Sequence, residues 1–493
     1  MSRAPQSRTA NPAAARYQAG LAALQAGRLT EARSTFAALD RAHPDQPEIQ
    51  FQLSRLAHLE GDRAARARHL DSALAKKPDE PALLQEATEA YARADRPEDA
   101  LAAFDRLIAK APGQIKPRAD KALYLQRIGR FAEAETIFRK LLAKHPREGA
   151  LYRMFFATAK LKADDPALKS LGQALRHSQV SGEARVQGHF AMAKARFDLG
   201  EHDTAFDELA RANRLQRKLA PYDVEARRAE QQAIRAAQEG ADLTPLGEAA
   251  DPRPVFVTGL PRSGTTLAEQ IIGAHSQAAA GGELAHALKL VWKSFTAQGR
   301  LAPLRSASET QIRDLARAYL TLARRDTGAQ TGVFTDKSIQ SHLVYGYLAR
   351  ALPGARFIVI HRDPRDIALS IYRNHFATGT HRYANDLGDI AGVIKDFRAS
   401  VTYWKGRLGD RIQEFRYEDL VSAPDTEAPR LVAAAGLDWE DGCLRFHESG
   451  GAVKTLSVAQ VREPIHAGRR AAWEKHAHQL APFIEAWGDD PWD

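Results

Sequence analysis

The first half of the chain repeats a pattern of apolar and small residues with a period of 34 positions. Three series keep this step without a gap: Phe36, Leu70, Phe104 and Phe138; Pro44, Pro78, Pro112 and Pro146; Gly27, Gly61, Asp95 and Gly129. A fourth series, Ala32, Ala100 and Ala134, is interrupted once by Arg66. The pattern is typical of paired helices, in which a small residue permits the turn, alanine allows close approach and proline ends the second helix.

The repeat weakens over residues 150–185 and returns in "HFAMAKARFDLGEHDTAFDELARANRL", where Gly200 and Ala205 keep the internal spacing. We therefore predict a disordered lead over residues 1–14, an all-α solenoid over 15–220 and a linker helix within 221–250. The period resembles that of the tetratricopeptide repeat, whose concave groove commonly binds peptides or proteins. A scaffold that only solubilises or dimerises the chain is the alternative role for this half.

The second half changes to alternating strand and helix patterns. "PVFVTG" has the apolar, β-branched composition of a strand, "GLPRSG" that of a loop, and "TTLAEQIIGAH" the apolar spacing of a helix. "ARFIVIHRDPRDIALSIYRNHF" repeats this order, with a strand over 356–361 and a helix from about residue 366. We predict an α/β domain over 251–493 with a parallel, P-loop-like sheet that binds its ligand at the carboxyl ends of the strands.

Composition narrows the class of ligand. The chain has 493 residues and a formal net charge of +9, which favours anionic ligands, and we find no nucleic-acid-binding motif. Its single cysteine, Cys443, excludes an internal disulfide. Because no apolar run reaches membrane-spanning length and the N-terminus lacks a secretory core, we expect a cytoplasmic protein without a membrane span, although an organelle-transit segment stays open.

The loop at residues 259–266 differs at one position from the phosphate-binding loop of proteins that bind nucleoside triphosphates. Thr265 stands where G-x-x-x-x-G-K-[ST] requires the lysine that reaches the β- and γ-phosphates. The strand over 356–361 runs into His361 and Arg362 instead of a metal-binding acid. The triplet His361-Arg362-Asp363 imitates a protein-kinase catalytic loop, but Ala368 stands where its asparagine belongs. A P-loop kinase with a triphosphate–magnesium site is therefore only an alternative.

These motifs resemble the sulfotransferases that use 3′-phosphoadenosine 5′-phosphosulfate, in particular bacterial tetratricopeptide-repeat sulfotransferases and tyrosylprotein sulfotransferases. The resemblance identifies Pro261–Thr266 as the loop for the 5′-phosphosulfate. It implies that Ser263, Gly264, Thr265 and Thr266 hold the 5′-phosphate through backbone N–H groups and hydroxyls. It places Arg262 beside the transferring sulfuryl group. Because this donor lacks β- and γ-phosphates, a lysine at position 265 has nothing to reach.

The resemblance also assigns residues outside the loop. Arg362 and Ser370, eight positions apart, match the 3′-phosphate site, and Lys337 matches a catalytic lysine that neutralises the leaving phosphate. The order Asp-Lys-Ser around Lys337 departs from the Lys-Asp-Pro of the tyrosylprotein enzymes. Three further positions match nucleotide contacts: Tyr417, Ser457 and Trp473. The lysine or glycine that the family has just before this tryptophan is not clearly matched here. Arg469 and Arg470 are the candidate substitutes.

The resemblance gives a general base and leaves the acceptor open. Aligned from Ala274 without a gap, Glu283 falls at the catalytic glutamate of the tyrosylprotein enzymes, while His275 and His286 are alternatives because many cytosolic sulfotransferases use histidine. The expected function is sulfuryl transfer to a hydroxyl without a metal. Peptide tyrosine, a sugar, a lipid or a small metabolite can supply that hydroxyl, and the solenoid favours a protein or peptide. A repeat scaffold with an inactive nucleotide-binding domain is the competing hypothesis, and the oligomeric state is left open.

Overall fold

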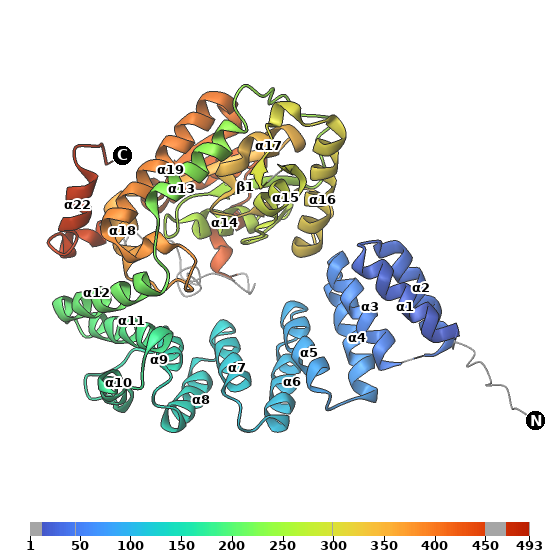
Figure 1. The fold of residues 1–493 in the computed structure, drawn as a ribbon, viewed down its shortest axis with the longest axis horizontal. Coiled ribbons are helices and arrows are strands. Elements are labelled where there is room, and N and C mark those ends of the chain that lie inside the picture. Colours follow the sequence, from blue (N-terminus) through green and yellow to red (C-terminus); the bar gives the residue numbers. More distant parts are fainter. Residues whose placement is uncertain (1–11, 45, 298, 449–469, 493) are drawn as a thin grey trace, which may run out of the picture. The chain divides into compact units, whose positions relative to one another are not determined.

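The computed structural model describes residues 12–44, 46–297, 299–448 and 470–492 (Figure 1). Contacts between residues divide the chain into two compact units, Met1–Lys121 and Ala122–Asp493. No helix within the described ranges combines the length and apolarity that crossing a bilayer requires.

The first unit consists of helix pairs, as the 34-residue period predicts. Its helices are α1 (Pro12–Gln25), α2 (Leu29–Ala42), α3 (Pro47–Glu60), α4 (Arg63–Lys76), α5 (Pro81–Arg93) and α6 (Pro97–Lys110), and α7 (Ile115–Arg127) crosses into the second unit. The turn position of each repeat has the left-handed conformation, with φ of 73° at Gly27 and 55° at Asp95. Phe36 is fully buried, and a Cβ at Gly20 would lie 2.8 Å from its ring, so the two helices of a pair approach closely at that position.

Arg66, which interrupts the alanine series, is buried in the first unit. Its guanidinium group donates to Glu86 at 2.7 Å and lies 3.6 Å from Glu89. The larger residue is accommodated because two carboxylates of the next helix compensate its charge.

The repeats continue into the second unit. Its first helices are α8 (Phe131–Lys144), α9 (Gly149–Phe156), α10 (Pro166–Arg176), α11 (Gly182–Asp198) and α12 (His202–Leu219). The short α9 and α10 form the degenerate unit that the sequence indicates near 150–185. Phe190 and Phe206 of α11 and α12 belong to the same hydrophobic core as Phe357 and Trp404 of the following domain. The last repeat is therefore part of the α/β domain's core.

A five-stranded, all-parallel sheet forms the centre of the α/β domain, in the order β2-β5-β1-β6-β7. Its strands are β1 (Arg253–Thr258), β2 (Ala278–Ala279), β5 (Val333–Asp336), β6 (Arg356–His361) and β7 (Ile412–Arg416). A separate antiparallel pair joins β3 (Thr296–Ala297) to β4 (Arg300–Leu301). The parallel sheet and the strand over 356–361 are confirmed.

Both faces of the sheet are buried, because alternate residues of each strand enter different cores. Phe256 and Phe357 face the larger core, whereas Val255, Val257 and Ile358 face the smaller one. Besides α11 and α12, the larger core includes residues of α15 (His286–Phe295), α16 (Glu309–Thr327), α17 (Tyr345–Ala351), α18 (Pro364–Tyr372), α19 (Leu387–Leu408) and α22 (Ala481–Trp487). Those of the smaller core are α14 (Thr265–Gly273), α20 (Tyr417–Ser422) and α21 (Pro424–Ala434). The segment predicted to link the halves contains α13 (Val224–Ala236).

Candidate active site

The glycine loop lies between the end of β1 and the start of α14, at the carboxyl edge of the sheet. Gly264 has φ of 101°, and a Cβ there would lie 2.4 Å from the Tyr417 ring. A Cβ at Gly259 would lie 2.4 Å from the Ser263 hydroxyl and 2.8 Å from the Ile360 carbonyl oxygen. Both positions therefore require glycine, because the loop is pressed against β6 and Tyr417.

The loop offers hydrogen-bond donors that suit a phosphate. Ser263 is fully buried, and its hydroxyl has no hydrogen-bond partner among the described residues. Thr265 and Thr266, also buried, open α14, where backbone N–H groups lack partners within the helix. A buried hydroxyl without a partner beside a helix N-terminus is a suitable environment for an anion.

Two arginines and a serine predicted from distant parts of the sequence meet beside this loop. Arg262 Nε donates to Ser370 Oγ at 2.9 Å, and Arg362 Nη1 donates to the Arg262 carbonyl oxygen at 3.1 Å. Arg262 itself has φ of 73°, a conformation that few non-glycine residues adopt. The Arg362 contact joins the end of β6 to the loop after β1, so the two predicted phosphate-binding elements form one site.

Tyr417 and Trp473 lie at the same end of the site. The Arg362 guanidinium group stacks over the Tyr417 ring at 4.5 Å and lies 3.4 Å from Asp366. The Trp473 backbone N–H donates to the other oxygen of Asp366 at 3.0 Å. Burial raises the pKa of Asp366, and the Arg362 charge opposes that rise.

Ser457, Arg469 and Arg470 were predicted, like Trp473, to contact the nucleotide. Ser457 and Arg469 lie outside the described residues. Arg470 donates to the Ser422 hydroxyl at 2.6 Å, on the short helix α20. Their predicted contacts with a nucleotide stay predictions.

The predicted base and the predicted lysine form an ion pair. Lys337 Nζ lies 3.0 Å from Glu283 Oε1, and the Lys337 backbone N–H donates to the Gly282 carbonyl oxygen at 2.9 Å. The Lys337 side chain is only 3% exposed, whereas that of Glu283 is 56% exposed. The pair therefore presents a carboxylate to the solvent side and keeps the ammonium group beneath it.

A buried carboxyl group that the sequence analysis missed supports the Glu283 segment. Glu269 of α14 accepts hydrogen bonds from the Gly282 N–H at 2.8 Å and from Thr335 Oγ1 at 2.9 Å. Burial raises the pKa of Glu269, and the nearby Lys337 charge opposes that rise. The available signal was a glutamate on the apolar face of the helix that follows the glycine loop.

An acid at the end of β5 also went unnoticed. Asp336 precedes Lys337, and its two carboxylate oxygens accept hydrogen bonds from Tyr319 at 2.8 Å and from Ser338 at 2.5 Å. Burial raises the pKa of Asp336. Asp336 therefore has a hydrogen-bonding role within the domain.

Glu283 borders a cavity of about 790 Å³. Its lining includes Tyr222, Arg227, Glu283, Leu288, His381 and Tyr383. Arg227 belongs to α13, so the segment predicted as a linker forms one wall. Sequence spacing gives no signal for this contribution, because α13 and the 379–383 segment meet only in the folded domain.

The two alternative histidines have other hydrogen-bond partners. His275 is buried, and its Nε2 lies 2.9 Å from the Asp438 carbonyl oxygen. His286 Nε2 lies 2.6 Å from Asp326. Neither residue is in the lining of the cavity beside Glu283.

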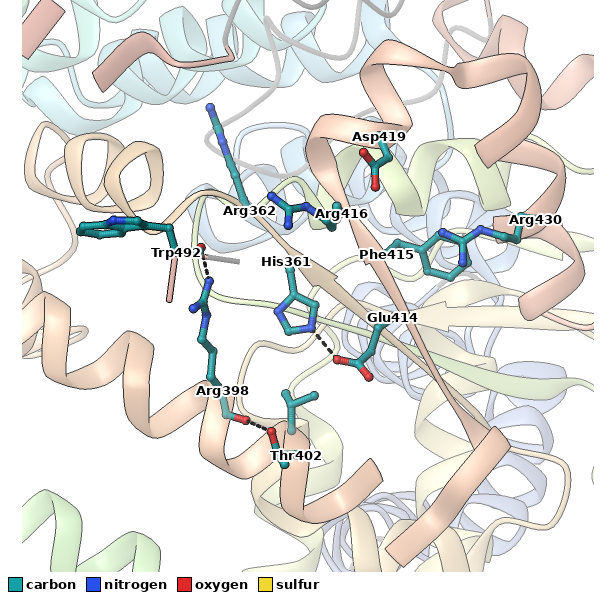
Figure 2. A pocket seen from close by; sticks show the side chains of 11 residues that line it. His361, Arg362, Arg398, Thr402, Glu414, Phe415, Arg416, Asp419, Arg430 and Trp492 are labelled. Carbon is teal, nitrogen blue, oxygen red and sulfur yellow. Dashed lines mark hydrogen bonds and ion pairs between the residues drawn. The ribbon is translucent and has the colours of Figure 1, made fainter. Parts of the chain in front are cut away.

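A second pocket, of about 490 Å³, lies at the ends of β6 and β7 (Figure 2). His361 of this pocket contacts Glu414 at 2.9 Å, and the Arg362 side chain points away from that pair in Figure 2. Arg398, Arg416 and Arg430 also line it, which makes this edge of the sheet strongly basic.

Comparisons with known proteins define the class of the two halves. Residues 254–441 match the profile of the sulfotransferase family, and residues 14–45 match the profile of the tetratricopeptide repeat. The α/β half is thus similar to the sulfotransferase family and the first repeat to the tetratricopeptide repeat, as the sequence motifs predict.

Individual relatives and one solved structure are similar to different parts of this chain. An uncharacterised protein of Aquifex aeolicus is 29% identical over 73% of this chain, which spans about half (48%) of that protein's length. A putative protein-tyrosine sulfotransferase of Caenorhabditis briggsae is 25% identical, over 48% of this chain and 89% of the relative. The sulfotransferase domain of the Synechococcus PCC 7002 olefin synthase is 18% identical, covers 50% of this chain and 98% of that domain, and superposes with a TM-score of 0.35.

Proposed function

We propose that this protein transfers a sulfuryl group from 3′-phosphoadenosine 5′-phosphosulfate to a hydroxyl acceptor. The supporting observation is the convergence of the glycine loop with Arg362 and Ser370, through the 2.9 Å and 3.1 Å contacts of Arg262. The buried Ser263 hydroxyl adds a donor without a protein partner among the described residues. A nucleotide with phosphates at both its 5′ and 3′ positions makes use of both groups of donors.

The chemistry requires one proton acceptor and positive charge near the leaving group. In this proposal, the acceptor oxygen forms a bond to sulfur as the bond between sulfur and the 5′-phosphate oxygen breaks. Glu283 takes the hydroxyl proton, and the phosphate oxygen keeps the electron pair of the broken bond. Lys337 and Arg262 stabilise the negative charge that develops there, as fixed cations do in other transfer reactions.

The acceptor favoured by this proposal is a tyrosine in a protein or peptide. The relative from Caenorhabditis briggsae is named a putative protein-tyrosine sulfotransferase, and tetratricopeptide repeats commonly bind peptides. The cavity beside Glu283 has a volume of about 790 Å³. That is within the range of pockets that enclose drug-sized ligands, so it has room for an aromatic side chain with flanking groups.

The test uses the full chain with donor labelled by radioactive sulfur. We expect transfer of label to protein in a cell lysate and to p-cresol, the side-chain analogue of tyrosine. Label in lipid or sugar fractions alone would exclude the protein acceptor but keep the transfer reaction. Absence of transfer to any fraction, in a preparation that binds adenosine 3′,5′-bisphosphate, would contradict the proposed activity.

The same preparation separates the two competing functions. An interaction scaffold with an inactive nucleotide domain would bind neither the bisphosphate nor the phosphosulfate by calorimetry. A P-loop kinase would bind adenosine triphosphate more tightly than the bisphosphate and would need magnesium.

A further inference from the structure

His381 lines the cavity beside Glu283 in a backbone conformation that histidine rarely adopts. Its φ is 42° and its ψ is 46°, which is the left-handed region that glycine occupies without strain. Such a conformation is strained in a non-glycine residue and persists only where the surroundings determine it. A glycine would fit this backbone better, so the presence of an imidazole calls for an explanation.

The last repeat helices hold the segment that carries His381. Gln216 donates to the Phe376 carbonyl oxygen at 2.7 Å, and Asn213 donates to the Tyr372 carbonyl oxygen at 3.1 Å. Arg217 also pairs with Asp386, which follows His381 in the sequence, at 2.5 Å. Anchors on both sides therefore fix the left-handed residue from α12.

The imidazole is fixed as well. Its ring packs edge-on against Phe376 at 4.8 Å and Tyr383 at 5.8 Å, and Nδ1 lies 3.4 Å from the Tyr383 hydroxyl. No hydrogen bond to Nε2 is present among the described residues. The Tyr383 hydroxyl can donate to Nδ1, because a phenol is protonated near neutral pH. In the tautomer that accepts this bond, the imidazole proton lies on Nε2.

Burial also lowers the pKa of His381, against the opposing charge of Glu283. The imidazole is therefore neutral near pH 7. It does not form a second permanent ion pair with the carboxylate, which stays available as a proton acceptor.

We propose that His381 is an acceptor-binding residue, whose Nε2–H donates a hydrogen bond to the oxygen of the acceptor hydroxyl. This inference rests on the proposed sulfuryl transfer and names the residue that orients the acceptor. The hydroxyl proton points to Glu283, one lone pair of the oxygen accepts from His381, and the other lone pair faces the sulfur. A phenol suits this arrangement, because its planar ring can pack against Tyr383 and Leu288 of the same lining.

The test replaces His381 by glycine, which removes the imidazole and relieves the backbone. We expect the KM for p-cresol to rise at least about tenfold, because the variant loses both the hydrogen bond to the acceptor and the orientation that this bond gives. The Kd for adenosine 3′,5′-bisphosphate should stay unchanged, and the melting temperature should be equal or higher. His381→Asn, which keeps an N–H donor and tolerates the left-handed region, should recover part of the KM loss.

Asp95→Gly is the matched control, because Asp95 has φ of 55° in the first unit, outside the α/β domain. It should leave KM, kcat and bisphosphate affinity unchanged. An unchanged KM for p-cresol in active His381→Gly would overturn the inference, as would equal losses in bisphosphate affinity and acceptor KM. Lack of turnover by the parent protein would instead overturn the proposed function, so the two failures are distinguishable.

Discussion

The two ends of the candidate active site differ in how their polar groups are satisfied. At the proposed donor end, Arg262 contacts both Arg362 and Ser370, and the buried Asp366 lies 3.4 Å from the Arg362 guanidinium group. At the acceptor end, Glu283 is 56% exposed and borders a cavity whose walls come from α13 and the 379–383 segment. A fixed nucleotide suits the first arrangement, and a bulky or variable acceptor suits the second. Variants should therefore separate donor binding from turnover.

The largest expected effect is that of Glu283→Gln on turnover. The amide keeps the shape of the side chain and removes the proton acceptor, so kcat should fall at least about a hundredfold. Affinity for adenosine 3′,5′-bisphosphate should stay within about threefold, or about 0.7 kcal/mol. Rates with radiolabelled donor and calorimetry measure the two quantities.

Glu248→Gln provides the control for this substitution, because Glu248 precedes β1 and is therefore at the opposite edge of the sheet. Near-normal kcat in Glu283→Gln would remove the assigned role of Glu283. His286, paired with Asp326 at the start of α15, would then be the next residue to change.

The second effect concerns the donor end. Arg362→Ala removes a cation that contacts both the glycine loop and Tyr417, and bonds to charged groups commonly contribute about 1.5–3 kcal/mol. Calorimetry should therefore show bisphosphate binding weakened by roughly ten- to a hundredfold.

Arg430→Ala is the matched control for charge, because Arg430 lines the neighbouring pocket and pairs with Glu427 of its own helix. It should change bisphosphate affinity little. An equal loss in both variants would mean that overall positive charge, and not a defined phosphate contact, determines affinity.

A third, smaller effect is that of Glu269→Gln on folding stability. Glu269 connects the helix after the glycine loop to the segment that carries Glu283. Glu269 of α14 accepts from Gly282, and burial raises its pKa above the ordinary value of 4.5. The contribution of such a carboxyl group to folding stability is fully present below pH 4.5, its pKa in the unfolded chain. This contribution is lost as the pH rises through the higher pKa of the folded state. Glu269→Gln keeps the accepting oxygen and cannot ionise. The variant should therefore gain stability over the parent, by up to about 1.4 kcal/mol per pH unit within that window.

Urea unfolding of both proteins between pH 4 and pH 8 measures this difference. A constant difference across the range would show that Glu269 does not titrate with a raised pKa. Loss of turnover in Glu269→Gln without loss of stability would indicate that its charge acts directly on the Glu283–Lys337 pair.

The smallest expected effect is that of metal removal. The glycine loop lacks the lysine of triphosphate loops, and Asp336, the acid that closes β5, has both oxygens hydrogen-bonded. Arg262 and Lys337 would supply the charge that magnesium supplies in phosphoryl transfer. Turnover should be the same in EDTA and in magnesium. Activity that disappears in EDTA and returns with magnesium would favour the kinase hypothesis, with Asp336 as the first candidate ligand.

The sequence predicted those features of the fold that depend on the spacing of nearby residues. The 34-residue period predicted the helix pairs, and the strand–loop–helix order predicted the glycine loop and its partner strand. Arg362 and Ser370 were assigned by the family resemblance, which matches their spacing of eight residues on one strand–helix connection. Lys337 and Glu283 came from the family resemblance, and the structure places them 3.0 Å apart.

Other features depend on contacts that no spacing records. Glu269 contacts a segment 13 residues away through its buried side chain, and His381 is held by α12 more than 150 residues earlier. Composition identified 221–250 as a linker, yet α13 forms a wall of the cavity. Such roles follow from how surfaces meet after folding, so they become visible only in the structure.

The shared core of α11, α12 and the α/β domain has a consequence for synthesis on the ribosome. Phe190, Phe206 and Leu209 belong to a cluster that also includes Trp487, so their apolar face is completed only when nearly the whole chain has emerged. The first unit can fold as soon as it appears, since domains generally fold from the N-terminus during translation. Until the rest of the α/β domain has been synthesised, the apolar face of α11 and α12 lacks its partners, and exposed apolar surface of this kind promotes aggregation. We therefore expect α11 and α12 to complete their folding after the first unit does.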